Sequence, residues 1–166
     1  MEENKILDRI KIKNAIRRIA YQIYESNIDL KEIYLVGISS NGILLSEKIG
    51  GFLKNIAKFK VNHIELKIDK QNPRLGAEIS LDINKLENKS IIIIDDVLDS
   101  GSTLLYAVNA FLNVSLQKIQ TVVLVNRNHK KFPIKADFKG ISLSTSVKQH
   151  IKVVFKPETN EGVYLS

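Results

Sequence analysis

Hydrophobic residues recur along the chain at two spacings, and these separate the predicted helices from the predicted strands. From about Lys5 to Ser26 the apolar positions follow a helical period, which predicts an amphipathic helix; these positions are Ile6, Ile10, Ile16, Ile19 and Ile23. After Gly42 leucines and isoleucines repeat in the same way and predict a second helix that ends near Leu53. Gly50 and Gly51 weaken that helix, because glycine has a low helix propensity.

Short apolar runs predict the strands, at residues 32–37, 59–68, 90–94 and 121–125. Residues 91–94 are all isoleucine, as in a central parallel strand that is covered on both faces. A third helix is predicted from about Ser102 to Asn113. This alternation predicts an α/β fold with an open, mostly parallel central sheet flanked by helices, whose ligands bind beyond the C-terminal strand ends.

The length and composition fit one globular domain over residues 1–166. The chain has no cysteine, a polar start at residues 1–5 and no apolar run near the roughly 18 residues of a membrane span, so we expect a cytoplasmic protein without a membrane segment. The net charge of +7 suits a partner that carries phosphates, either a small polyphosphate or a nucleic acid. Many cations lie in residues 5–18 and 130–156, which form one basic patch if the chain ends meet and otherwise only solvate the surface.

The loop that follows the isoleucine strand carries the candidate chemistry. Gly101 permits a tight turn, and hydroxyls beside it lie where the third helix begins, which is an arrangement that binds phosphate; these hydroxyls belong to Ser100, Ser102 and Thr103. Asp95 and Asp96 lie where the strand ends, so at least one carboxylate should accept hydrogen bonds from ligand hydroxyls. A phosphate site one loop away from a diol site predicts a ribose 5-phosphate.

Other interpretations of this loop are weaker. A P-loop requires Gly-x-x-x-x-Gly-Lys before Ser or Thr, and a dinucleotide fold requires Gly-x-Gly-x-x-Gly, and the loop has neither pattern. A purely structural interpretation makes the acids a turn and the Ser-Gly-Ser-Thr run a helix cap. Each half alone is common in that role, but the whole string behind four isoleucines favours a ligand site.

The same string resembles the phosphoribosyl-pyrophosphate motif of type I phosphoribosyltransferases: apolar residues, two acids, two apolar residues, then Asp-Ser-Gly-Ser-Thr. The resemblance implies the fold of that family, including a small hood. It implies that Asp95 and Asp96 hold the ribose hydroxyls and that residues 100–103 hold the 5-phosphate. Asp99 stands where purine-specific members carry an aspartate near the base, whereas uracil-linked relatives usually have tyrosine. Asp95, Asp96 and Asp99 are the candidate catalytic residues, and the ring preference stays open.

A second resemblance selects the pyrimidine-operon attenuation regulator and uracil phosphoribosyltransferase family. Residues 125–140 are similar to that family's segment Asp-Arg-Gly-His-Arg-Glu-Leu-Pro-Ile-Arg-Ala-Asp, and residues 144–146 are similar to its following Pro-Thr-Ser. Residues 17–23 resemble a helix that reads Thr-Arg-Ile-Ala-His-Glu-Ile. The likeness therefore extends from about Ile16 to Phe155.

The chain departs from the family at positions that bear on substrate binding and at positions that bear on RNA binding. The pyrophosphate loop of the family usually reads Lys-Thr-Arg-Gly, and the corresponding residues here carry neither cation; they are Ser39, Ser40, Asn41 and Gly42. Ser102 replaces a frequent arginine in the phosphate turn. Arg18 is retained, but Arg17 and Tyr21 replace a threonine and a histidine that the family uses in RNA contacts.

The resemblance implies transfer of ribose 5-phosphate from 5-phosphoribosyl-1-pyrophosphate to a nucleobase, with uracil to UMP as the leading hypothesis. Mg²⁺ would arrive with the substrate rather than in a protein metal cage, and held geometry and charge stabilisation would replace a covalent nucleophile. The predicted base pocket contains Val125, Arg127 and Ile134. The polar segment 69–76 is a candidate lid, from which Arg74 either reaches the pyrophosphate or stays in solvent.

Two alternatives to a uracil enzyme remain at this stage. One is a nucleotide-sensing, RNA-binding regulator of pyrimidine operons with weak or no catalysis, in which the basic segments contact RNA phosphates. The other is a purine phosphoribosyltransferase, which Asp99 favours. The resemblance also implies a homo-oligomer.

Overall fold

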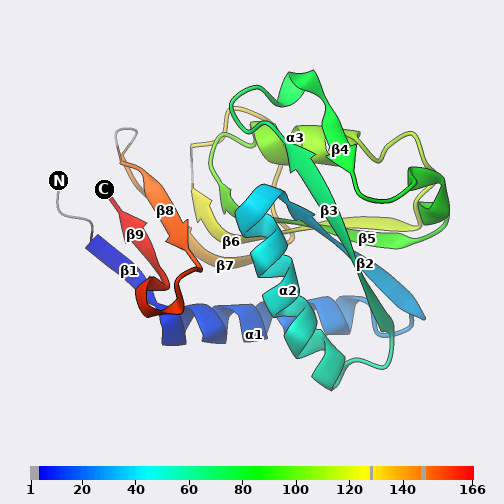
Figure 1. The fold of residues 1–166 in the computed structure, drawn as a ribbon, viewed down its shortest axis with the longest axis horizontal. Helices are drawn as coiled ribbons and strands as arrows, with labels where there is room; N and C mark the ends of the chain where they lie inside the picture. The colour runs from blue at the N-terminus through cyan, green and yellow to red at the C-terminus, as the bar shows by residue number, and fades with distance from the viewer. Residues whose placement is uncertain (1–3, 128, 147–148) are drawn as a thin grey trace.

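The computed structural model describes residues 4–127, 129–146 and 149–166. Residues 1–3, which contributed to the expectation of a cytoplasmic protein, and Asn128, within the second resemblance, lie outside these described residues. Six strands form the central sheet in the order β4-β3-β2-β5-β6-β7. Figure 1 labels each of these strands. Their bounds are β2 (Glu32–Ile38), β3 (Lys60–Ile68), β4 (Ala77–Ile79), β5 (Ser90–Leu98), β6 (Lys118–Arg127) and β7 (Phe138–Leu143).

The strand order confirms the α/β fold with a mostly parallel sheet. All neighbours pair in parallel except β4, which runs antiparallel to β3. The chain moves outward from β2 to β3 and β4, and β5 then pairs with the other side of β2. The strand order therefore reverses between β2 and β5, and a crevice for ligands is expected beyond the C-terminal ends of these two strands.

Helices cover both faces of the sheet. Two helices, α1 (Arg9–Ser26) and α2 (Ser39–Ile56), pack on one face, and α3 (Ser102–Asn109) packs on the other. The isoleucines of β5 divide between the two cores, because successive side chains of a strand point to opposite faces. Ile92 and Ile94 join the core with α1 and α2, whereas Ile91 and Ile93 join the core with α3. This confirms β5 as a central strand covered on both sides.

A second, three-stranded sheet lies beside the central sheet and corresponds to the expected small hood (Figure 1). It joins both ends of the described chain in the antiparallel order β1-β9-β8, with β1 (Asn4–Asp8), β8 (Ile151–Val154) and β9 (Gly162–Leu165). The buried Glu161 precedes β9, and its Oε1 forms an ion pair with Nζ of Lys48 in α2 at 2.8 Å. This pair holds the small sheet against the helical layer. The two basic segments of the sequence therefore do meet, since Arg18 of α1 also donates to the carbonyls of Lys139 and Gly140.

Three predicted boundaries differ in the structure. The first helix begins at Arg9 rather than Lys5, because Asp8 caps it through a 2.8 Å bond from the Lys11 amide and residues 4–8 pair as β1. Residues 39–42, predicted as the pyrophosphate loop, already form the first turn of α2, which begins at Ser39. The third helix ends at Asn109 and continues as turns.

Gly50 and Gly51 do not interrupt α2. A Cβ atom at Gly50 would lie 2.6 Å from Cε1 of His63, so the glycine allows α2 to pack closely on β3. Short 3₁₀ helices occupy Pro73–Leu75, Ile83–Leu86 and Glu158–Asn160. Among the described residues, no helix combines the length and apolar character needed to cross a bilayer.

Candidate functional site

The acidic pair lies at the C-terminal end of β5, beside the point where the strand order reverses. Asp95 and Asp96 are only 2% and 8% exposed, yet both line a cavity of about 320 Å³. The residues that line this cavity come from the segment after β3, from β5 and the turn after it, from α3, from β6 and from the hood. They are Lys70, Asp95, Asp96, Val97, Leu98, Asp99, Ser100, Gly101, Thr103, Leu104, Val123 and Ile151. The structure thus brings the predicted diol site and the predicted phosphate turn into one cavity.

Lys70 contacts both acids. Its Nζ lies 2.7 Å from Oδ1 of Asp95 and 2.9 Å from Oδ1 of Asp96. Burial alone would lower the pKa of Lys70, but the two carboxylates outweigh it and raise that pKa above its ordinary value. The ammonium group therefore stays charged and acts as the counter-ion of the pair.

The two acids have different affinities for a proton. Burial raises the pKa of Asp95 to about 7, and the neighbouring Asp96 adds to the rise while Lys70 opposes it. Burial also tends to raise the pKa of Asp96. The charge of Lys70 and hydrogen bonds with Asp95, Asn41 and Lys70 outweigh burial, so the pKa of Asp96 lies below its ordinary value. Two ionised carboxylates this close together in a buried site repel each other. Asp96 therefore carries the negative charge, and Asp95 holds a proton more readily.

The first turn of α2 is joined to the acidic pair and to the hood. Nδ2 of Asn41 donates to Oδ2 of Asp96 at 2.8 Å and to the carbonyl of Val153 in β8 at 3.1 Å. A Cβ atom at Gly42 would lie 2.5 Å from the carbonyl oxygen of Ile94, so only glycine permits this close approach of α2 to β5. The predicted pyrophosphate loop therefore lies directly beside the predicted ribose site.

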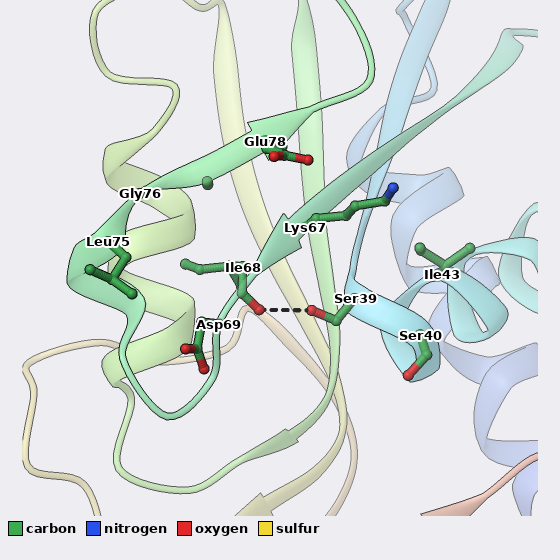
Figure 2. A pocket seen from close by; sticks show the side chains of 10 residues that line it. Ser39, Ser40, Ile43, Lys67, Ile68, Asp69, Leu75, Gly76 and Glu78 are labelled. Atoms are coloured by element: carbon green, nitrogen blue, oxygen red, sulfur yellow. Dashed lines mark hydrogen bonds between the residues drawn. The ribbon is translucent and has the colours of Figure 1, made fainter.

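A second cavity, of about 720 Å³, borders this turn (Figure 2). It is lined by Ser39 and Ser40 from α2, by the end of β3 and by the segment that leads into β4. Ser39 has a positive φ of 50°, and its Oγ donates to the carbonyl of Ile68 at 3.1 Å. This bond ties the end of β3 to the start of α2, as the dashed line in Figure 2 shows.

The predicted phosphate turn has the geometry of a tight strand-to-helix junction. Gly101 has a φ of 88°, in the left-handed region, and α3 begins at the next residue. A Cβ atom there would lie 2.8 Å from Cγ2 of Ile134, so this position requires glycine for two reasons. The backbone carbonyl of Ser100 accepts bonds from the amides of Lys131 and Phe132, which fixes the turn against the segment after β6.

Arg127 is buried at the end of β6 and organises the predicted base region. Its Nη1 lies 3.1 Å from Oδ1 of Asp99, and its other nitrogens donate to Oγ1 of Thr145 at 3.0 Å and to the carbonyl of Ser146 at 3.2 Å. Ile134 packs against Gly101, so two of the three predicted base-pocket residues lie next to the phosphate turn. Val125 instead belongs to the buried core on the α1 side.

The structure separates Arg74 from the pyrophosphate loop. Arg74 is exposed and lines a hollow with Ser102 and Tyr106, and its Nε donates to Asn72 at 3.3 Å. Sequence reasoning missed Lys70, which lies four residues earlier in the candidate lid and contacts both acids directly. The position of Lys70 in the sequence could have indicated this contact. Lys70 is a cation two residues after a predicted strand, and the C-terminal end of that strand lies on the same edge of the sheet as the acids.

Comparison with known protein sequences finds one family and a set of close relatives. The family described as phosphoribosyl transferase domain matches residues 3–159. The bifunctional protein PyrR of Pediococcus pentosaceus is 34% identical in an alignment of 173 residues. The alignment covers 98% of this chain and 98% of that protein. The pyrimidine operon regulatory protein of Lactococcus lactis subsp. lactis is 33% identical over 159 residues, with coverages of 92% and 90%.

Solved structures with the same fold include purine enzymes. A hypoxanthine-guanine phosphoribosyltransferase of Bacillus anthracis superposes with a TM-score of 0.76 at 16% identity and covers 100% of this chain and 99% of that one. A hypoxanthine phosphoribosyltransferase of Staphylococcus aureus gives a TM-score of 0.77 at 17% identity, with coverages of 97% and 90%. At such low identity the likeness establishes the fold alone.

Proposed function

Because the chain belongs to the phosphoribosyl transferase domain family, we propose that it transfers ribose 5-phosphate from 5-phosphoribosyl-1-pyrophosphate to uracil, forming UMP and pyrophosphate. The observation that carries this proposal is the single cavity that contains both the acidic pair and the turn at Gly101. The names of the curated relatives, bifunctional PyrR and pyrimidine operon regulatory protein, support a pyrimidine base. Asp99 keeps a purine base as the alternative to be tested.

The proposed roles are those that the resemblance implies, and the positions of the side chains support them. Asp95 and Asp96 accept hydrogen bonds from the ribose hydroxyls, and the turn of Ser100, Gly101, Ser102 and Thr103 binds the 5-phosphate. The bond from C1 to the pyrophosphate oxygen breaks, a bond from C1 to the uracil nitrogen forms, and the proton of that nitrogen is lost to solvent. The protein holds the reacting atoms in place and stabilises charge, so no covalent nucleophile is required.

Mg²⁺ is part of the proposal, because the substrate carries a pyrophosphate and hard cations prefer oxygen ligands. The oxygens of the substrate would hold the ion, and bound Mg²⁺ would neutralise charge on the leaving pyrophosphate. Within residues 4–127, 129–146 and 149–166, no three His, Cys, Asp or Glu side chains are grouped so that they could hold a metal ion.

The proposal is tested by incubating the protein with 5-phosphoribosyl-1-pyrophosphate, Mg²⁺ and one nucleobase at a time. We expect nucleoside monophosphate to form with uracil and not with hypoxanthine or guanine. The Asp96→Asn variant should fold normally and lose turnover, because it replaces the ionised member of the pair. Turnover with a purine would move the assignment to the purine class, and absence of product with every base would refute the enzyme.

Regulatory RNA binding is the second candidate function, and the outer face of α1 favours it. Ile10 and Tyr21 are 71% and 42% exposed and lie eleven residues apart, which is about three helical turns. Arg17 lies between them, with its guanidinium 6.0 Å from the centre of the Tyr21 ring. Aromatic and guanidinium planes stack on unpaired bases. Salt-sensitive, sequence-selective RNA binding that an Arg17→Ala and Tyr21→Ala double variant abolishes would establish this function.

Self-association is also part of the proposal, on the family resemblance. Analytical ultracentrifugation of the whole chain at several concentrations tests it, and sedimentation as a monomer throughout would exclude it.

A further inference from the structure

We propose that Lys48 and Glu161 are positioning residues for the substrate site. Their ion pair, at 2.8 Å between Nζ and Oε1, sets the angle at which the hood stands over the acidic pair. Both residues belong to the described part of the chain, and neither lines the 320 Å³ cavity of the acids, so they act on it through the hood. The kinetic consequence rests on the proposed function, and the experiment below separates the two.

Glu161 is a buried carboxylate at the junction of the hood with both helices. Its side chain is 3% exposed, and it contacts Lys48 of α2 at 2.8 Å and Arg9 of α1 at 3.4 Å. Arg9 is shared with the exposed Glu158, which it contacts at 2.6 Å. A buried ion pair adds little net stability over apolar side chains of similar size, because removing both charges from water offsets their attraction. The pair does impose a direction, since its oxygen and nitrogen atoms must meet.

The helix α2 holds the hood at two points. Nδ2 of Asn41 donates to the carbonyl of Val153 in β8 at 3.1 Å. Lys48 follows seven residues later, which is about two helical turns and therefore the same face of α2. Its ammonium pairs with Glu161 and lies 5.6 Å from the ring centre of Phe155, just beyond β8. The two points are about 10 Å apart along α2, and together they fix the angle of the hood.

The apolar contacts of the hood do not fix this angle. Side chains from the hood and its borders join the core that contains α1 and α2; they are Leu7, Val153, Phe155 and Val163. Apolar burial is non-directional, so these side chains hold the hood on the helical layer without selecting one orientation. Without the pair at Lys48, the hood would stay attached at Asn41 and would turn about that bond.

A turn of the hood about Asn41 reaches the acids. Ile151, in the same strand as Val153, lines the cavity together with the acidic pair. Asn41 itself donates to Oδ2 of Asp96 at 2.8 Å. Rotation about this contact therefore changes the distance between Ile151 and the acids, and with it the room for a ribose bound there. A misplacement of about 1 Å caused far from the reacting atoms can lower a rate about a hundredfold.

The test separates positioning from stability by comparing a single variant with a double variant. Lys48→Met leaves the buried Glu161 without its shorter ion pair, so the urea midpoint should fall. The double variant Lys48→Met with Glu161→Met has no charge to compensate and should unfold near the wild-type midpoint. Glu158→Gln is the matched control, because it weakens the exposed pair with Arg9 and leaves Lys48 joined to Glu161.

Two further measurements are made on each protein. The first is kcat/KM for 5-phosphoribosyl-1-pyrophosphate, with uracil and Mg²⁺. In the double variant it should fall about tenfold to a hundredfold although stability is restored, as for misplaced reacting groups. The second is hydrogen exchange of the β8 amides without substrate, followed by mass spectrometry. Exchange should be faster in the double variant than in wild type, because local opening is independent of global stability. Glu158→Gln should match wild type in both.

Wild-type stability combined with lowered kcat/KM and faster β8 exchange in the double variant supports the proposal. Wild-type kcat/KM in the double variant overturns it, because the pair would then serve stability alone. A double variant as unstable as Lys48→Met also overturns it, because the pair would be required for folding itself. If the wild type forms no nucleotide with any base, the proposed function fails, and the exchange rates of β8 still decide whether the pair orients the hood.

Discussion

Nδ2 of Asn41 donates a hydrogen bond to Oδ2 of Asp96 at 2.8 Å and thereby joins the first turn of α2 to the acidic end of β5. Residues 41 and 96 come from two elements that flank the reversal of strand order. The other donor hydrogen of the same amide bonds the carbonyl of Val153 in the hood. One side chain therefore links the predicted pyrophosphate turn, the acid that is predicted to bind ribose and the hood.

Replacing Asn41 should impair catalysis more than it impairs folding. Asn41→Ala removes a hydrogen bond to a charged oxygen, so we expect kcat/KM for 5-phosphoribosyl-1-pyrophosphate to fall by about tenfold to a hundredfold. Asn41→Asp should be worse, because it places a third carboxylate beside the pair. Steady-state kinetics and thermal unfolding measure both effects. A variant with normal kinetics would show that Asn41 does not position Asp96.

Asp95 should make the stability of the protein depend on pH in a defined direction. Its pKa in the folded protein is raised to about 7 from an ordinary value of 3.8, so the folded state holds the proton more tightly than the unfolded state. The resulting contribution to stability is fully present below pH 3.8 and is lost as the pH rises towards 7. Asp95→Asn removes this dependence.

We therefore expect the free energy of unfolding of Asp95→Asn, relative to wild type, to increase between pH 5 and pH 8. Urea unfolding of both proteins at the two values measures the difference. The Asp99→Asn variant serves as the control, because that carboxylate is more than half exposed. A difference between Asp95→Asn and wild type that does not change with pH would contradict the raised pKa.

Alanine at Gly101 should destabilise the protein more than alanine at Gly76. Both glycines have a positive φ, 88° and 100°, and alanine in this region costs about 1–2 kcal/mol. At Gly76 a Cβ atom meets nothing within 4 Å, whereas at Gly101 it would lie 2.8 Å from Ile134. Overpacking of this kind adds about 1–3 kcal/mol. Urea unfolding of the two variants measures the difference, and equal losses would show that Ile134 yields freely.

Within the Arg127–Asp99 ion pair, replacing Arg127 should destabilise the protein more than replacing Asp99. Arg127 is 4% exposed, and Arg127→Met removes its hydrogen bonds to the hydroxyl of Thr145 and the carbonyl of Ser146. The loss of these bonds from a charged group should cost about 1–3 kcal/mol. Asp99→Asn weakens a half-exposed pair and should cost less than about 1 kcal/mol. Chemical denaturation measures both stabilities. Comparable losses would mean that Asp99, and not the buried contacts, holds Arg127.

The same pair of variants bears on the choice of base. If Arg127 orders the base pocket, Arg127→Met should raise KM for the nucleobase while KM for 5-phosphoribosyl-1-pyrophosphate changes little. Assays with each substrate varied in turn separate the two constants. A rise confined to the sugar substrate would place Arg127 outside the base pocket.

Much of the fold was predictable, because it depends on local periodicity. The four isoleucines of β5 and the helical spacing of Ile16, Ile19 and Ile23 indicate which residues are buried before any partner is known. Ile10, which was predicted on the same helix face, is instead 71% exposed. The ends of the elements were less predictable. Residues 4–8 continue the apolar pattern of α1 but form β1, because Gly162–Leu165 at the other end of the chain supplies its hydrogen-bond partners. No local pattern reports a pairing partner so distant in sequence.

The candidate site divides in the same way. The sequence by itself determined where the acidic pair and the glycine turn lie, because a strand that ends in two acids leads directly through glycine into a helix. Only the tertiary structure decided that Lys70 neutralises those acids, that Asn41 bonds one of them and that Arg74 lies elsewhere. Polar side chains pair according to their distance in space, which the local sequence does not specify. The parallel crossovers bring Lys70 and Asn41 to Asp96, although they are 26 and 55 positions away from it.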